Sequence, residues 1–388
     1  MRSCGSWTIA ACACSLFMVV ACSDARRESG GALEAPSRAA DSADASQWPL
    51  FRGSPTLDGV ATTSLVEQPE LLWSFEVGSD VESTAAIADN TVYVGALDGF
   101  LYAIDLLQGE LRWKLDVGEE IRSSPSVRDG VVYFGDEMGY FHAVDTTTGV
   151  EKWSFETLAG IVSGANFHGD HLVFGSYDNS LYCLRSEDGS LAWKVETDGY
   201  VHGTPAIVGE YTTVSGCDGF LWLVRLENGE VETKIDLQGQ TGASPAVVGD
   251  RAYVGTYSNQ VLSLDLKTRE VSWAYEHPER KFPYYASAAA TEDLVIIGGR
   301  DKIVHALDAE TGEALWTYPA GARIDSSAVI VGSRVFLATT RGEALALDIG
   351  SGERVWSFET GSAFAASPSV AQRRLVISSL DGVVYCFG

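Results

Sequence analysis

Tryptophans recur along this chain with a period of forty residues. They stand at Trp73, Trp113, Trp153, Trp193, Trp273, Trp316 and Trp356, at intervals of 40, 40, 40, 80, 43 and 40. Thr233 occupies the position that the interval of 80 skips. Eight repeat units therefore fill residues 71–388, and a period near forty with several short strands per unit indicates a β-propeller.

Each unit contains four short runs of strand-like composition separated by turns. In residues 121–157 we expect strands over 121–127, 131–135, 140–145 and 151–155, with glycines in the turns. The chain is therefore predicted to be all-β, with eight blades that are each a four-stranded antiparallel meander. Proline or alanine at the twelfth residue after each tryptophan position suits a crowded axis, so we expect the first strand to line the central channel.

The last unit supplies only three strands before the chain ends at Gly388. Residues 71–77 carry a fourth-strand pattern with no preceding three. We expect this N-terminal strand to complete the eighth blade, because pairing it there removes two exposed sheet edges. The propeller then spans residues 71–388, preceded by an arm over residues 47–70 whose Trp48 and Phe51 are expected to dock on the propeller body.

The front of the chain is typical of an export signal. Residues 1–21 combine Arg2 with an apolar run, which predicts a signal peptide. The residues Val19-Val20-Ala21-Cys22 resemble a bacterial lipobox, so Cys22 is the predicted lipidation site; a plain signal peptide or an uncleaved anchor is the alternative. Residues 22–46 are expected to form a flexible tether to a lipid bilayer.

Charge and cysteine content narrow the function classes. The chain has 27 Lys and Arg against 53 Asp and Glu, a net charge of -26, which disfavours nucleic-acid partners and leaves cationic partners open. Once the signal and Cys22 are set aside, Cys183, Cys217 and Cys386 remain. Three widely spaced cysteines do not make a disulfide framework.

A second motif strengthens the propeller interpretation and suggests a family. The pattern Ala-x-Asp-x-x-x-Gly-x-x-x-Trp is complete in the units that end at Trp113, Trp153, Trp316 and Trp356. It resembles the tryptophan-docking motif of the pyrroloquinoline-quinone-type (PQQ-like) eight-bladed propellers. The resemblance implies that all seven tryptophans are structural and pack between neighbouring blades. Because Thr233 replaces the tryptophan, blades four and five should form the weakest junction.

The resemblance implies two classes of function. One is the quinoprotein dehydrogenases, which bind PQQ and Ca²⁺; the other is the non-catalytic lipoproteins of the bacterial envelope, some of which act in outer-membrane protein assembly. The chain has no adjacent cysteine pair, no room for an insertion domain and no nucleophile or zinc motif. We therefore expect a scaffold without enzymatic activity or cofactor. A PQQ-dependent oxidoreductase and a propeller that binds a small ligand stay as alternatives.

Two features suggest where a partner would bind. The ninth residue after each tryptophan position varies although the framework repeats, and residues 277–285 contain the only insertion in the ring, rich in aromatic and basic side chains. A loop that only covers its own blade is the alternative for the insertion. The predicted partner-binding residues are Glu82, Arg122, His202, Arg280, Lys281, Phe282, Tyr284, Tyr285 and Asp325. We expect a monomeric body at the outer membrane that faces the periplasm and binds an envelope protein.

Overall fold

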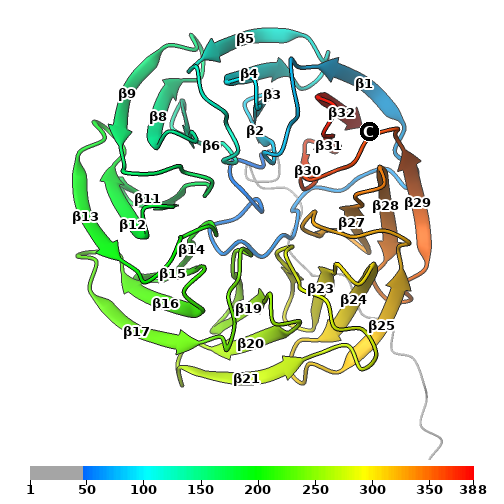
Figure 1. Ribbon diagram of the computed structural model, residues 1–388. Helices are drawn as coiled ribbons and strands as arrows, with labels where there is room; N and C mark the ends of the chain where they lie inside the picture. The colour runs from blue at the N-terminus through cyan, green and yellow to red at the C-terminus, as the bar shows by residue number, and fades with distance from the viewer. Residues whose placement is uncertain (1–46) are drawn as a thin grey trace, which may run out of the picture. The chain divides into compact units, whose positions relative to one another are not determined.

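The computed structural model describes residues 47–388, which form a ring of eight four-stranded antiparallel sheets (Figure 1). The predicted fold class is therefore confirmed. The predicted signal peptide, the lipidation site Cys22 and the tether lie outside the described residues. Within residues 47–388 there is no helix long and apolar enough to cross a membrane.

Each blade is a meander whose first strand lies nearest the channel (Figure 1). Blades 1 to 4 consist of β2 (Ala86–Ala88), β3 (Thr91–Gly95), β4 (Phe100–Asp105) and β5 (Leu111–Asp116); β6 (Ser126–Arg128), β7 (Val131–Gly135), β8 (Tyr140–Asp145) and β9 (Glu151–Glu156); β10 (Asn166–His168), β11 (His171–Ser176), β12 (Ser180–Arg185) and β13 (Leu191–Glu196); and β14 (Ala206–Val208), β15 (Tyr211–Ser215), β16 (Phe220–Arg225) and β17 (Val231–Asp236). Blades 5 to 8 consist of β18 (Ala246–Val248), β19 (Arg251–Gly255), β20 (Val261–Asp265) and β21 (Glu270–Tyr275); β22 (Ala289–Ala290), β23 (Leu294–Gly298), β24 (Ile303–Asp308) and β25 (Ala314–Pro319); β26 (Val329–Val331), β27 (Arg334–Ala338), β28 (Glu343–Asp348) and β29 (Arg354–Glu359); and β30 (Ser369–Ala371), β31 (Arg374–Ser378), β32 (Val383–Phe387) and β1 (Leu71–Glu76).

The innermost strands are shorter than the sequence predicts. In blade 2 the expected strand over residues 121–127 is only β6, Ser126–Arg128. The residues before the innermost strands also bond around the ring, because in seven of the eight blades a backbone N–H donates to a hydroxyl of the next blade at 2.8–3.1 Å. The pairs are Thr84 to Ser124, Gly164 to Thr204, Thr204 to Ser244, Ser244 to Ser287, Ser287 to Ser327, Ser327 to Ser367 and Ser367 to Thr84.

Tryptophan docking joins neighbouring blades as the resemblance implies. Six of the seven docking indole N–H groups donate to a backbone carbonyl of the next blade at 2.8–3.2 Å, as Trp113 does to Thr146. The indole of Trp356 bonds to Pro69 of the arm, so the arm takes the place of a blade turn there. At the junction without a tryptophan, Arg269 stands where other blades have glycine, and it forms an ion pair with Glu232.

The ring closes through its two ends, as predicted. Strand β1 pairs antiparallel with β32, with Phe75 opposite Val384, so the two lie side by side in the eighth blade (Figure 1). Trp73 of β1 then docks on blade 1 through its bond to the Leu106 carbonyl at 2.9 Å. The eighth blade therefore joins to its neighbour in the same way as the other tryptophan-docked blades.

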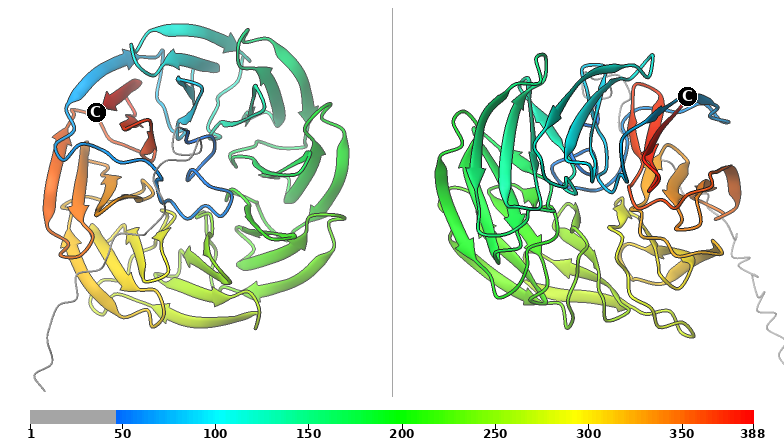
Figure 2. Two further views of the ribbon diagram at one scale, coloured as in Figure 1. Left: turned by 180° about the vertical axis from the view of Figure 1, so that it is seen from behind. Right: turned by 45° about the horizontal axis from the view of Figure 1, so that its top comes forward.

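The arm does more than dock on the body: it passes around the inside of the channel (Figure 2). Its backbone bonds to the innermost strands of six blades, through Trp48 with Ile87, Pro49 with Val127, Pro55 with Ile207, Thr56 with Val247, Asp58 with Ala290, and Gly59 and Ala61 with Ile330. Between Pro49 and Pro55 the arm turns inward, and the Arg52 guanidinium donates to the carbonyls of Ala288 and Ala328 at 2.6 and 2.5 Å. Burial lowers the Arg52 pKa to about 9, which leaves the side chain protonated at neutral pH.

Candidate binding site at the channel mouth

One mouth of the channel is surrounded by two sets of variable residues. In a meander the connections between blades and the turns between second and third strands lie on the same face. The first set, the loop ring, consists of Glu82, Arg122, Val162, His202, Gly242, Tyr285, Asp325 and Ala365, all half-buried. The second set, the turn ring, consists of Leu97, Glu137, Tyr177, Cys217, Tyr257, Arg300, Thr340 and Leu380.

A repeated backbone bond fixes the turn ring against the loops. In all eight blades the N–H of the turn-ring residue donates to a carbonyl of the preceding interblade loop, as Glu137 does to Glu120 and Tyr177 does to Gly160. These bonds measure 2.8–3.3 Å. The backbone therefore holds the eight turn-ring side chains in similar positions, and only their chemistry differs.

Arg122 is the centre of an acidic cluster on this mouth. Its guanidinium lies 2.6 Å from Glu82, 2.8 Å from Glu120 and 3.1 Å from Glu137. Burial raises the pKa of Glu137, and the charges of Glu120 and Glu82 raise it further. The charge of Arg122 lowers this pKa but does not cancel the increase. One cation thus faces three carboxylates, which leaves this sector with excess negative charge.

Aromatic side chains form the next sector. The Tyr177 hydroxyl and the His202 Nδ1 share a hydrogen bond of 2.6 Å, and the Tyr177 ring stacks on Tyr200 at a centroid distance of 5.0 Å. Burial lowers the pKa of His202, which favours a neutral imidazole. Burial raises the Tyr177 pKa to about 12, with a further contribution from the charge of Glu137. The two sectors are neighbours, because Gly160 accepts the Tyr177 N–H at 2.9 Å and lies beside the Glu137 carboxylate.

A third sector combines an aromatic stack with an ion pair. The Tyr257 and Tyr285 rings stack at 4.2 Å, and the Arg300 guanidinium lies 3.3 Å from the centroid of the Tyr285 ring. Arg300 also binds Asp325 through two bonds of 2.7 and 3.1 Å. A planar guanidinium suits both the aromatic face and the carboxylate.

The insertion loop meets the expectation only in part. Phe282 is 49% exposed beside Lys281, which pairs with Glu276 at 3.2 Å, and Arg280 donates to the Asp301 carbonyl at 3.0 Å. Tyr284 corrects the prediction of a contact residue, because it is only 1% exposed and packs in the core of blades 5 and 6. Tyr284 stands directly before the loop-ring residue, a position that is buried in every blade, as at Ile121 and Ile324, so its place in the repeat and not the insertion turns its ring inward.

The sequence predicts the loop ring but not the turn ring. Glu137, Tyr177, Tyr257 and Arg300 contact or influence the predicted residues, and each occupies the second position of a turn between second and third strands. The available signal was the same as for the loop ring, since this turn position also changes from unit to unit. Among residues 47–388 no group of three or more His, Cys, Asp and Glu side chains could hold a metal ion.

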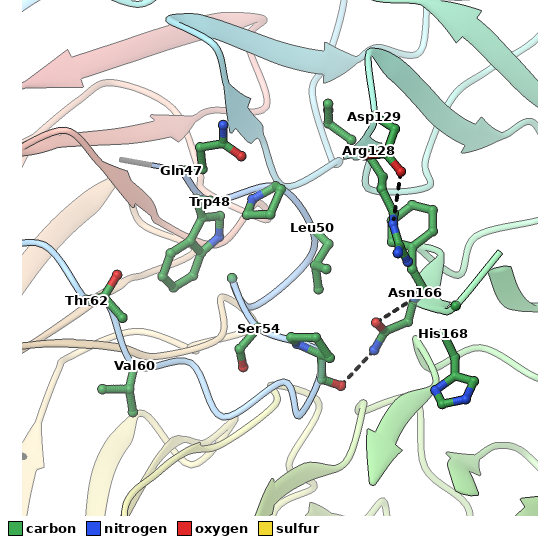
Figure 3. Close-up of a pocket in the computed structure, with 16 residues that line it drawn as sticks. Gln47, Trp48, Leu50, Ser54, Val60, Thr62, Arg128, Asp129, Asn166 and His168 are labelled. Carbon is green, nitrogen blue, oxygen red and sulfur yellow. Dashed lines mark hydrogen bonds and ion pairs between the residues drawn. The ribbon is translucent and has the colours of Figure 1, made fainter. Parts of the chain in front are cut away.

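A cavity of about 850 Å³ lies between the arm and blades 2 and 3 (Figure 3). Leu50, Ser54 and Val60 of the arm line it, together with Arg128 and Phe167 of the blades. At blade 3 a side chain holds the arm, because Asn166 donates to the carbonyls of Pro55 and Pro205 and accepts the Phe167 N–H. That side chain replaces the backbone pairing that the arm makes at other blades.

The fold, the docking tryptophans and the N-terminal strand closure define an eight-bladed propeller of the PQQ-like class. Within it, the chain belongs to the family of the outer membrane protein assembly factor BamB, whose model matches residues 62–162, 142–232 and 214–387. No curated protein sequence matches the chain.

Solved structures share the fold. BamB from Moraxella catarrhalis is 20% identical with a TM-score of 0.70, covering 82% of this chain and 99% of that one. Quinohemoprotein alcohol dehydrogenase from Comamonas testosteroni is 13% identical with a TM-score of 0.74, covering 89% and 81%. A europium-containing methanol dehydrogenase is 13% identical with a TM-score of 0.73, covering 88% and 98%. At these identities the likeness concerns the fold, which binding proteins and enzymes share.

Proposed function

We propose that the protein is a non-catalytic scaffold in outer-membrane protein assembly and that the channel mouth binds an envelope protein partner. Membership of the BamB family supports the setting. The observation that carries the site is the pair of rings, in which a repeated backbone bond presents eight chemically different side chains on one face. Preorganised aromatic and arginine side chains are the kind of surface that protein interfaces favour.

The path of the arm supports binding at the mouth over chemistry inside the channel. The arm bonds to six blades and inserts Arg52 between Ala288 and Ala328, so a ligand on the axis would compete with it. The described residues contain no group suited to a metal ion. These residues therefore do not fit a PQQ–Ca²⁺ pair on the axis, and we derive no step through one.

We further propose that Cys22 carries the lipid anchor and that a monomeric body faces the periplasm from the outer membrane. The BamB family supports an envelope location. The lipobox-like residues before Cys22 support the anchor. The net charge of -26 supports a protein partner over nucleic acid.

Photo-crosslinking in the membrane-anchored protein tests the proposal. A crosslinking residue replaces Phe282, which is exposed at the mouth, and a control replaces Thr147 in the turn between β8 and β9 on the opposite face. We expect one discrete outer-membrane protein to be captured from position 282 and not from position 147. Capture from neither position, together with a thermal melt shifted by PQQ and Ca²⁺, would favour the oxidoreductase alternative.

A further inference from the structure

The mouth contains two tyrosine stacks, and among the described residues only one of them holds a cation on its face. In the third sector Tyr285 carries Arg300 on its face, and Asp325 holds the other edge of that guanidinium. In the aromatic sector, Tyr177 and Tyr200 are stacked beside acidic residues, but no cation of the described residues lies over either ring. The two stacks use different positions of the repeat, because His202 is the equivalent of Tyr285 and also stacks on Tyr177, but each stack offers an aromatic face beside carboxylates.

The carboxylates needed for a second cation are already in place. Arg122 is the one cation against Glu82, Glu120 and Glu137, so it does not neutralise them. The acidic and aromatic sectors adjoin at Gly160, which lies beside the Glu137 carboxylate and accepts the Tyr177 N–H at 2.9 Å. Aromatic faces and carboxylates together attract a guanidinium more strongly than either does alone.

Apolar residues flank the aromatic sector on the outside. Leu158 is 87% exposed, and in most other units the same loop position is glycine or a polar residue. Met138 is exposed in a turn position that is aspartate in most units. The loop with Leu158 lies between the two turns, because Thr157 donates to the Gly139 carbonyl and the Leu158 N–H donates to Asp178. Exposed apolar side chains at these two positions are departures from the repeat.

We propose that the partner protein inserts an arginine side chain between the Tyr177–Tyr200 stack and the carboxylates of Glu82 and Glu137. Apolar residues beside that arginine would contact Leu158 and Met138. This inference rests on the proposed function and states the chemistry of its partner: a short apolar segment with one arginine. Arginine is favoured over lysine because a planar guanidinium can contact an aromatic ring and a carboxylate at once. Arg300 does this at the same mouth, where it lies on Tyr285 and bonds to Asp325.

Peptide binding tests the assignment. The probe is a fluorescein-labelled amidated pentapeptide, Gly-Leu-Arg-Leu-Gly, and its matched control carries neutral citrulline in place of arginine. We expect fluorescence polarisation to show at least tenfold tighter binding of the arginine peptide, weakening as salt is added. Equal binding of the two peptides, or no binding of either, would overturn the proposal.

Substitutions locate the binding. Glu137→Gln and Tyr200→Ala should each weaken the arginine peptide at least threefold. Their controls are Glu187→Gln, which removes the same charge from the opposite face, and Leu107→Ala, which removes an equally exposed side chain there. All four residues are at least partly exposed, so the variants should fold, and a thermal melt checks this. If the controls weaken binding as much as the mouth variants do, the effect is general charge or hydrophobicity and the proposal fails.

The two hypotheses fail in different ways. If the crosslinking residue at position 282 captures an outer-membrane protein while the peptides do not distinguish arginine from citrulline, the arginine assignment is wrong and the scaffold function stands. If position 282 captures nothing and the peptides also bind equally, the mouth is not the partner site and both are wrong.

Discussion

At the residue scale, the docking unit is a tryptophan together with a glycine of the next blade. A Cβ on the six docking glycines, such as Gly149 beneath Trp113, would come within 2.5–2.9 Å of the indole. These glycines also have positive φ, as Gly149 does at 69°, which disfavours other residues. Tryptophan and glycine are therefore both replaced at the junction where Thr233 faces Arg269. An ion pair between Arg269 and Glu232 joins the two blades there instead.

Restoring both members of that unit should strengthen the junction between blades 4 and 5. Thr233→Trp alone should lower the free energy of unfolding by about 1–2 kcal/mol, because the indole meets Arg269. Thr233→Trp with Arg269→Gly should raise it above wild type by about 1–2 kcal/mol, since indole burial exceeds the value of an exposed ion pair. Urea unfolding measures both, with Arg269→Gly alone as the control. A double variant no more stable than Thr233→Trp would contradict the paired-unit explanation.

The buried thiol of Cys183 predicts a loss of stability in alkali. Burial raises its pKa from 9.0 to about 12. Because the folded pKa lies above the unfolded one, the stabilisation is complete below pH 9 and is lost as pH rises towards 12. Cys183→Ala restores the residue that the repeat has at this position, so the variant should fold.

The comparison between pH 8 and pH 10.5 measures this effect. Wild type should lose about 1–2 kcal/mol more of its free energy of unfolding than Cys183→Ala over this range. The other titrating groups, including Cys386, are common to both proteins and cancel in the difference. Parallel losses in urea unfolding would show that Cys183 does not titrate as its burial implies.

At the element scale, single strands and short segments decide how the ring holds together. Strand β1 covers the edge of β32 and brings Trp73 to blade 1, so one strand contributes both a sheet edge and a blade junction. The arm contributes a second closure, because it bonds to innermost strands that lie far from one another along the chain. Neither segment has a core of its own.

Removing strand β1 should abolish cooperative unfolding. Deletion of residues 71–78 exposes the β32 edge and removes the docking of Trp73. We expect a broad calorimetric transition at lower temperature. Leu71→Ser, at an exposed position of the same strand, is the control and should melt like wild type. A deletion variant with an unchanged sharp transition would show that closure does not depend on β1.

At the scale of the whole molecule, the ring is held by three circular systems. Docking tryptophans join the outer strands, Ser and Thr hydroxyls join the loops next to the channel, and the arm joins the innermost strands. The hydroxyl system is interrupted once, between Ser124 and Gly164, because glycine has no hydroxyl to accept the bond. The arm passes this point, with Phe51 beside Gly164.

Deleting the arm should loosen the channel wall around the whole ring. Without residues 47–60, the amides of Val127, Ile207 and Val247 lose their acceptors. Hydrogen exchange at these three amides should accelerate at least tenfold, while the outer strand β9 should keep its protection. Arg52→Ala is the local control, because it retains the backbone bonds of the arm and removes the side-chain bonds to Ala288 and Ala328. Unchanged exchange in the deletion variant would mean that the arm does not stabilise the innermost strands.

Much of the candidate site could be predicted because repetition acts as an internal comparison. The loop ring, with Glu82, Arg122, Tyr285 and Asp325, stood out because it varied where the framework repeated. The partners of these residues could not be assigned, because His202 contacts Tyr177 of the preceding blade and Arg300 reaches both Tyr285 and Asp325. Such pairings depend on how neighbouring blades are placed around the axis.

The sequence by itself determined the number of blades, the order of their strands and the closure by residues 71–77, because these follow from local periodicity copied eight times. Only the tertiary structure decided the path of the arm and the division of the mouth into acidic and aromatic sectors. Those features join residues from different blades. Their contacts exist only once the ring has closed and fixed the direction in which each side chain points.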